Sequence, residues 1–79
     1  RQKLDLTLTE FKLLTCLMRA PNKVFSREEL LVNCLPEGDT QERTVDSHVS
    51  KLRKKLEALQ IQGVPLSVWG VGYRFGGEL

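Results

Sequence analysis

The clearest pattern of hydrophobic and polar positions lies in the segment RTVDSHVSKLRKKLE, residues 43–57. At about 100° per residue its apolar side chains fall in one narrow stripe, the spacing of a helix docked on a core. The opposite side carries hydroxyls, an imidazole and cationic groups, so the pattern predicts a helix over about 41–59 with one buried and one basic face. The stripe is Val45, Val49, Leu52 and Leu56, and the polar face is Arg43, Thr44, Ser47, His48, Lys51, Arg53, Lys54 and Lys55.

Two shorter helices are predicted upstream, over about 8–19 and 27–35. The runs TLTE at 7–10 and SREE at 26–29 are capping boxes, which mark helix starts. In the first helix we expect one apolar stripe to face the core and a second pair to be covered by other strands. The stripe is Leu8, Phe11, Leu14 and Met18, the pair is Leu13 and Leu17, and the second helix is expected to bury Leu30, Leu31 and Cys34.

Strands are predicted at both ends of the chain. Alternation of polar and apolar residues over Lys3 to Leu8 predicts a short strand, whose partners must lie elsewhere. Residues 64–69 are apolar and β-prone, Gly70-Val71-Gly72 can turn, and 73–75 return, which predicts a hairpin over about 64–76. The fold class is therefore α+β: three helices followed by a hairpin, the plan of a winged helix-turn-helix.

Composition and charge narrow the function. The 79 residues, 41% hydrophobic, suit one globular domain, and no apolar run approaches the length of a membrane span. From Arg43 onward six Lys and Arg face three Asp and Glu, whereas the preceding part has six against seven. This asymmetry indicates an anionic partner for the C-terminal half. Cys16 and Cys34 are expected to be free thiols in a reducing cytosol. The chain begins without Met, so we expect it to be a fragment of a longer protein.

Candidate catalytic chemistry is sparse. No Ser/His/Asp set, phosphate-cradling glycine loop or metal-ligand cluster is recognisable, so we expect no enzyme activity and no cofactor. His48 is the only histidine, which makes a metal-ligand role implausible; groove contact and a surface role both stay open. Asp46 is expected to be structural, bonding the helix start or pairing with Arg43 or Arg53.

The runs LTLTEFKLL, VFSREELL, RTVDSHVSKLRKKLE and GVGYRF resemble the OmpR/PhoB-type effector domains of bacterial two-component response regulators. They span nearly the whole chain in the family's order and spacing, and the third run is similar to that of the BaeR-like subgroup. The resemblance implies sequence-specific binding of double-stranded DNA, with the third helix in the major groove and the hairpin as a wing. It also implies an upstream receiver domain phosphorylated through a sensor kinase, and a four-stranded sheet that ends at Lys3 to Leu8.

The resemblance distributes roles along the chain. It implies base or groove contact by Ser47, His48, Ser50 and Lys51, and backbone contact by Arg43, Thr44, Arg53 and Tyr73. Lys51 is the preferred base reader, because an ammonium donates well to guanine O6 and N7. Lys54 and Lys55 either contact phosphates or complement the C-terminal end of the helix dipole. The wing comprises Trp69, Gly70, Gly72 and Arg74.

The acidic loop 36–42, with Glu37, Asp39 and Glu42, corresponds to the family's loop that contacts RNA polymerase, although it is also interpretable as a plain solvated loop. The family binds direct repeats as dimers, whereas the isolated domain is compatible with a monomer. A cytoplasmic location is implied, without membrane contact. An alternative for the basic face is docking on an acidic protein partner.

Trp69 departs from the family, whose members commonly carry Arg before the wing glycine, where it enters the minor groove. An indole cannot supply the cationic contact that a narrow minor groove favours. Packing in the core is the preferred interpretation of Trp69, and contact with DNA or a neighbouring protomer are the alternatives. The third helix is therefore expected to carry more of the sequence discrimination than it does in relatives.

Overall fold

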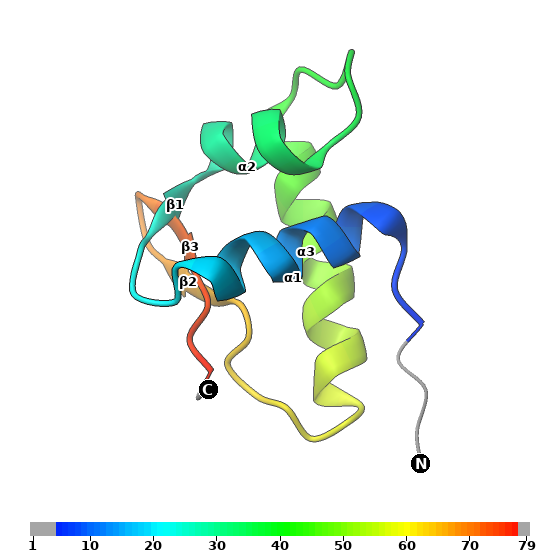
Figure 1. The fold of residues 1–79 in the computed structure, drawn as a ribbon, viewed down its shortest axis with the longest axis vertical. Helices are drawn as coiled ribbons and strands as arrows, with labels where there is room; N and C mark the ends of the chain where they lie inside the picture. Colours follow the sequence, from blue (N-terminus) through cyan, green and yellow to red (C-terminus); the bar gives the residue numbers. More distant parts are fainter. Residues whose placement is uncertain (1–4, 78–79) are drawn as a thin grey trace.

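The computed structural model describes residues 5–77, and within them three helices pack against a small antiparallel sheet, which confirms the winged-helix plan. In Figure 1, α1 crosses α3, and the strands lie beside the C-terminal part of α1. The elements are α1 (Leu8–Arg19), β1 (Phe25–Ser26), α2 (Arg27–Cys34), α3 (Glu42–Glu57), β2 (Leu66–Val68) and β3 (Gly72–Arg74).

The first two helices begin at the predicted capping boxes. The Thr7 hydroxyl accepts from the Glu10 backbone N–H at 3.2 Å, and the Glu10 carboxylate accepts from the Thr7 N–H at 3.0 Å. Ser26 and Glu29 form the same reciprocal pair at the start of α2. Each box satisfies two backbone donors that a helix start leaves without partners. α3 begins at Glu42 without a side-chain cap.

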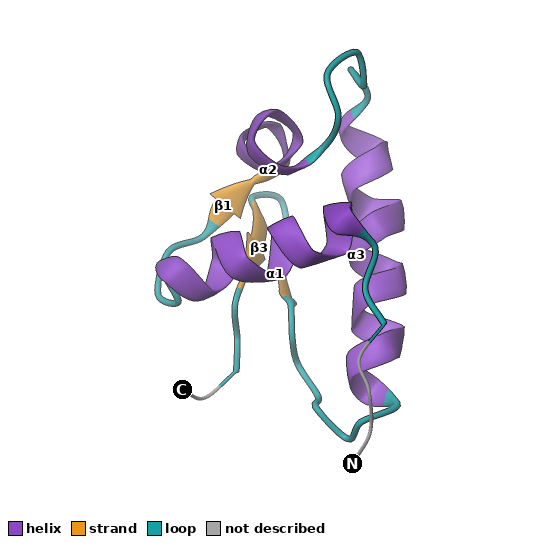
Figure 2. Ribbon diagram, turned by 45° about the vertical axis from the view of Figure 1, so that its right-hand side comes forward, coloured by secondary structure: helices purple, strands orange, loops and turns teal. Residues whose placement is uncertain are grey.

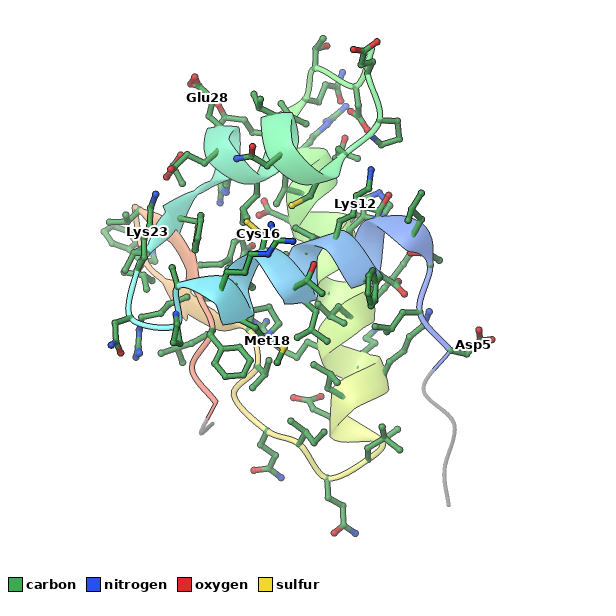
Figure 3. The ribbon with its side chains drawn as sticks, in the orientation of Figure 1. Asp5, Lys12, Cys16, Met18, Lys23 and Glu28 are labelled. Atoms are coloured by element: carbon green, nitrogen blue, oxygen red, sulfur yellow. The ribbon has the colours of Figure 1, made fainter. Side chains whose placement is uncertain are left out.

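α3 buries the predicted stripe, but in α1 the second pair enters the core, and of the expected stripe Leu14 is partly buried against the core. Leu13 and Leu17 are fully buried, whereas Leu8, Phe11 and Met18 are 69%, 55% and 42% exposed. Figure 3 shows Cys16 on the side of α1 that faces α2, and Met18 away from α2. The prediction was wrong because α1 has two apolar faces, and hydrophobic spacing does not say which one meets the other helices. The buried stripe of α3 is Val45, Val49, Leu52 and Leu56.

The predicted N-terminal strand is not supported where it can be checked. Lys3 and Leu4 lie outside the described residues, residues 5–7 are not in a strand, and Leu8 is already helical. This segment is held instead by one tertiary interaction and one local interaction. The Asp5 backbone carbonyl accepts from Lys55 Nζ at 2.9 Å, and Thr7 serves as the cap of α1. The alternation of side chains is therefore not sufficient for a strand here.

The hairpin forms as predicted, but its strands are shorter and a third strand joins it. β3 lies between β2 and β1, with Tyr73 opposite both Ser67 and Phe25. Gly72 makes the β1–β3 approach possible, because a Cβ at this position would lie 1.9 Å from the Phe25 carbonyl oxygen. β1, at Phe25–Ser26, was not predicted, since two residues are too few to show a period. Through it, the wing is joined to the start of α2 (Figure 2).

Candidate nucleic-acid interface

The outer face of α3 carries the polar side chains that the sequence singled out. Ser47, Ser50, Lys51 and Lys54 are exposed, and His48 and Thr44 are half-buried. Within residues 5–77 none of these six side chains forms a hydrogen bond or ion pair. Because the opposite face of the same helix is fully buried, α3 is held rigidly while its hydroxyls, imidazole and ammonium groups remain available.

Arg43 lies at the start of this face. Its Nε donates to the Gln41 side chain at 2.9 Å, and the guanidinium remains exposed. Only one of its five N–H donors is engaged with a described residue, so the others can still bind an anion.

Arg53 connects α3 to the wing. Its Nε and Nη2 both donate to the Pro65 carbonyl, at 3.2 and 2.5 Å, and Nη2 also donates to Ser67 Oγ at 3.1 Å. The resemblance implied a phosphate contact for Arg53, and the geometry adds a second role. The planar fork of the guanidinium fixes the hairpin against α3. Ser67 was not singled out from the sequence, because its bond spans 14 residues.

Asp46, Tyr73 and Arg27 form a second connection beneath the interface. The Tyr73 hydroxyl donates to Asp46 Oδ1, and Arg27 Nε pairs with the same oxygen at 3.1 Å. Burial, and then the hydrogen bond to Asp46, raise the pKa of Tyr73 to about 12. Asp46 is thus structural as expected, but its partners are Arg27 and Tyr73; the expected pairing with Arg43 or Arg53 was wrong. The phenol expected to contact the DNA backbone is buried and faces α3.

Lys55 turns away from the exposed face of α3. Its Nζ donates to Glu10 Oε1 at 2.6 Å and to the Asp5 carbonyl oxygen, so it ties α3 to the start of α1. Glu10 is only 1% exposed. Burial would raise the pKa of Glu10, but the bonds from Lys55 and from the Thr7 N–H lower it below the usual 4.5. Lys55 therefore differs from Lys54, whose ammonium group is exposed.

The wing turn exposes Trp69 almost completely. Its side chain is 97% exposed and Val71 is 55% exposed, so the preferred interpretation of Trp69 as a packed residue was wrong. The Val71 N–H donates to the Val68 carbonyl oxygen at 3.0 Å and closes the turn, in which Gly70 adopts φ +77°. A groove of about 610 Å³ runs beside it, lined by the wing and by the first turns of α2 and α3.

The acidic loop before α3 projects from the top of the molecule in Figures 1 and 2. Glu37 and Glu42 are exposed and Asp39 is half-buried, and none of the three forms an ion pair with a described residue.

In the wing, Gly70 and Gly72 shape the turn and the start of β3, and Arg74 is half-buried in β3.

Other chemistry is limited in the described part of the chain. Residues 5–77 contain no group of three or more His, Cys, Asp and Glu placed to hold a metal ion. Cys16 and Cys34 are free thiols, and burial, followed by the neighbouring Cys16, raises the pKa of Cys34 to about 12. Cys34 is therefore a protonated core residue at neutral pH. None of the described helices is long and apolar enough to cross a bilayer.

Comparison with known protein families shows which family this chain belongs to. Residues 1–75 match the family model described as "Transcriptional regulatory protein, C terminal". The chain belongs to this family. It is 49% identical over 74 residues to the transcriptional regulatory protein BaeR of Escherichia coli, and 44% identical over 79 residues to SrrA of Staphylococcus aureus. The alignments cover 91% and 94% of this chain, but it spans only 31% and 32% of those relatives.

Solved structures give the same result for the fold. The DNA-binding domain of the response regulator AdeR, crystallised with an intercistronic region, is 53% identical with a TM-score of 0.87, covering 94% of this chain and 74% of that one. The DNA-binding domain of Bacillus subtilis CssR is 30% identical with a TM-score of 0.72, covering 90% and 77%. The similarity to the OmpR/PhoB-type effector domains and to BaeR is confirmed.

Proposed function

We propose that this domain binds double-stranded DNA sequence-specifically, as the effector of a two-component response regulator, with α3 in the major groove. The observation that carries the proposal is the division of α3 into a fully buried apolar face and a polar face whose six outer side chains have no partner among residues 5–77. A helix with small polar and cationic residues fits the major groove, where base edges present acceptors and donors. The AdeR domain, crystallised with an intercistronic region, supports the assignment.

The side-chain geometry refines the roles within this proposal. Lys51, with Ser47, His48 and Ser50 around it, is the base-reading group of the exposed face. Arg43, Thr44 and Lys54 bind phosphates, since each retains donors at the edge of that face. The remaining three predicted phosphate contacts are engaged inside the fold, so their main contribution is to position α3 and the wing; they are Arg53, Lys55 and Tyr73.

The wider assembly is also a proposal. The curated relatives are about three times as long as this chain, which supports an upstream receiver domain controlled by a sensor kinase. The exposed acids of loop 36–42 suit a contact with RNA polymerase, and direct-repeat sites would be filled by two copies. DNA and RNA polymerase are both found in the bacterial cytoplasm, so we propose that this assembly forms there.

Selection of binding sites from a random duplex pool, followed by fluorescence anisotropy with labelled duplexes, tests the function. We expect an enriched half-site and tight binding to it. Lys51→Ala should weaken binding to the selected site by about 1–3 kcal/mol and relax preference at one base pair. Lys54→Ala should weaken selected and random duplexes alike, because a phosphate contact carries no sequence information.

Lys12→Ala is the matched control, since it removes the same charge from an exposed lysine on α1. It should leave both affinities nearly unchanged. Equal losses on selected and random duplexes for Lys51→Ala would contradict base reading. Failure of the unmodified domain to bind any duplex at low salt would contradict the function as a whole and favour a protein partner for the basic face.

A further inference from the structure

We propose that Cys16 and Cys34 form a binding site for a monovalent, thiophilic metal ion, of the class of Cu(I) and Ag(I), held between their two sulfurs. The site goes beyond the proposed function. The pocket that contains both thiols is lined by α1 with its C-cap, β1 and α2, and by no residue of α3.

Two thiols from different helices meet in this pocket. Cys16 lies in α1 and Cys34 is the last residue of α2, and both line a cavity of about 410 Å³. Figure 3 shows Cys16 on the side of α1 that faces α2. The thiols are close enough for Cys16 to raise the pKa of Cys34, after the larger effect of burial. Cys16 is half-buried and Cys34 is 2% exposed, so an ion would enter past Cys16.

The side chains that line the pocket select the class of ion. They include two thiols but no carboxylate and no imidazole. Mg²⁺ and Ca²⁺ need several oxygen ligands, and a structural Zn²⁺ takes four ligands, so a pair of thiols does not suffice for these ions. Soft sulfur ligands select Cu(I). Cu(I) and its analogue Ag(I) accept two thiolates in a nearly linear arrangement, which needs no third protein ligand.

The charges around the pocket favour a monovalent ion. Coordination releases both thiol protons to solvent and transfers no electrons, so the ion and its two thiolates together carry one negative charge. Lys12 and Arg19 line the same pocket. Burial raises the pKa of Cys34 most, and the Lys12 ammonium counteracts it by favouring the thiolate. These cations would stabilise the anionic complex and would repel a hydrated divalent cation.

Oxidation to a disulfide is the competing use of two neighbouring thiols. The thiolate is the form that reacts with oxidants. Cys34 remains protonated at neutral pH, because burial and then Cys16 raise its pKa to about 12. A metal ion does not need a preformed thiolate, since coordination itself displaces the proton. The pair is therefore better suited to metal binding than to oxidation.

Titration with Ag(I) in chloride-free and oxygen-free buffer, with glutathione as the competing thiol, tests the site. Native mass spectrometry should show one Ag(I) retained per chain, because two thiols held together have an effective concentration that separate glutathione molecules lack. Cys16→Ala and Cys34→Ala should each lose the ion to glutathione. Without glutathione, Ag(I) should protect Cys16 from alkylation by N-ethylmaleimide. It should also raise the midpoint of thermal unfolding, because it ties α1 to α2.

Met18→Leu is the matched control. Met18 is the only methionine of the chain, is 42% exposed and points away from α2 (Figure 3), so this variant should retain Ag(I) like the unmodified domain. Loss of Ag(I) from the unmodified domain to glutathione would overturn the inference. Retention of the ion by Cys16→Ala, with its fold verified by circular dichroism, would also overturn it, whether or not Cys34→Ala folds. Duplex binding is measured separately, so neither result affects the proposed function.

Discussion

At the scale of single residues, the buried charged side chain among the described residues is an acid. Glu10 caps α1 and simultaneously accepts from Lys55 of α3, although only 1% of it is exposed. A buried carboxylate is tolerated only when its oxygens are hydrogen-bonded and its charge is paired. The capping box was readable from the sequence, but the partner 45 residues away was not.

Glu10→Gln should destabilise the domain by about 1–3 kcal/mol at neutral pH, since it replaces a charged acceptor with a neutral one. The pKa of Glu10 is lowered in the folded state, so its carboxylate stabilises the fold above the usual value of 4.5. This contribution is lost as the pH falls through the lower folded pKa. Urea unfolding at pH 7 and at about pH 3 should therefore show a difference between the two proteins that shrinks in acid.

Glu57→Gln is the control, because the carboxylate of this exposed residue at the end of α3 has no hydrogen bond or ion pair with the described residues. It should change stability by less than about 0.5 kcal/mol. A Glu10→Gln effect that stays constant with pH would contradict the ion pair with Lys55.

At the scale of elements, α3 is the common support of α1 and the wing. Lys55 connects it to the segment before α1, Arg53 to β2, and Asp46 to β3. These bonds span 12 to 50 residues, and each uses a polar residue of α3 that sequence spacing places beside the exposed face. Residues that look alike on a helical projection therefore divide into two groups, those that bind inside the fold and those that remain available.

Arg53→Lys should loosen the wing although it keeps the charge. A lysine ammonium on its flexible stem cannot reproduce the planar fork that reaches Pro65 and Ser67 together. We expect faster hydrogen exchange at the β2 and β3 amides and a weaker duplex affinity, with a helix content that is unchanged. Ser67→Ala, which removes only one of the two acceptors, should have a smaller effect in the same direction. Unchanged amide exchange in Arg53→Lys would show that the guanidinium does not hold the hairpin.

At the scale of the whole molecule, the decisive feature is which face of α1 meets the other helices. Leu13 and Leu17 enter the core formed with α2 and α3, and this leaves Leu8, Phe11 and Met18 exposed. An exposed apolar stripe on one helix is a usual mark of a surface that contacts something else.

Leu13→Ala should therefore destabilise the domain by about 2–5 kcal/mol, because it leaves a cavity among three helices. Phe11→Ala removes a larger side chain but should change stability by less than about 1 kcal/mol, because Phe11 is already 55% exposed. Thermal unfolding of both variants measures the contrast. A larger loss for Phe11→Ala would reverse the assignment of the two faces.

The sequence by itself determined the local elements of this protein. The capping boxes located α1 and α2, the apolar stripe of α3 predicted its buried face, and the glycines placed the wing turn, because each of these signals acts between residues close in the chain. Family similarity then indicated the fold, which the described residues confirm.

Only the tertiary structure decided the rest. It chose the buried face of α1, paired the two-residue β1 with β3, assigned Arg53, Lys55 and Tyr73 to partners inside the fold, and left Trp69 in solvent. The physical reason is the same in each case. A helical or strand period states which residues share a face, but the partner of that face is set by packing between segments that lie far apart in the chain.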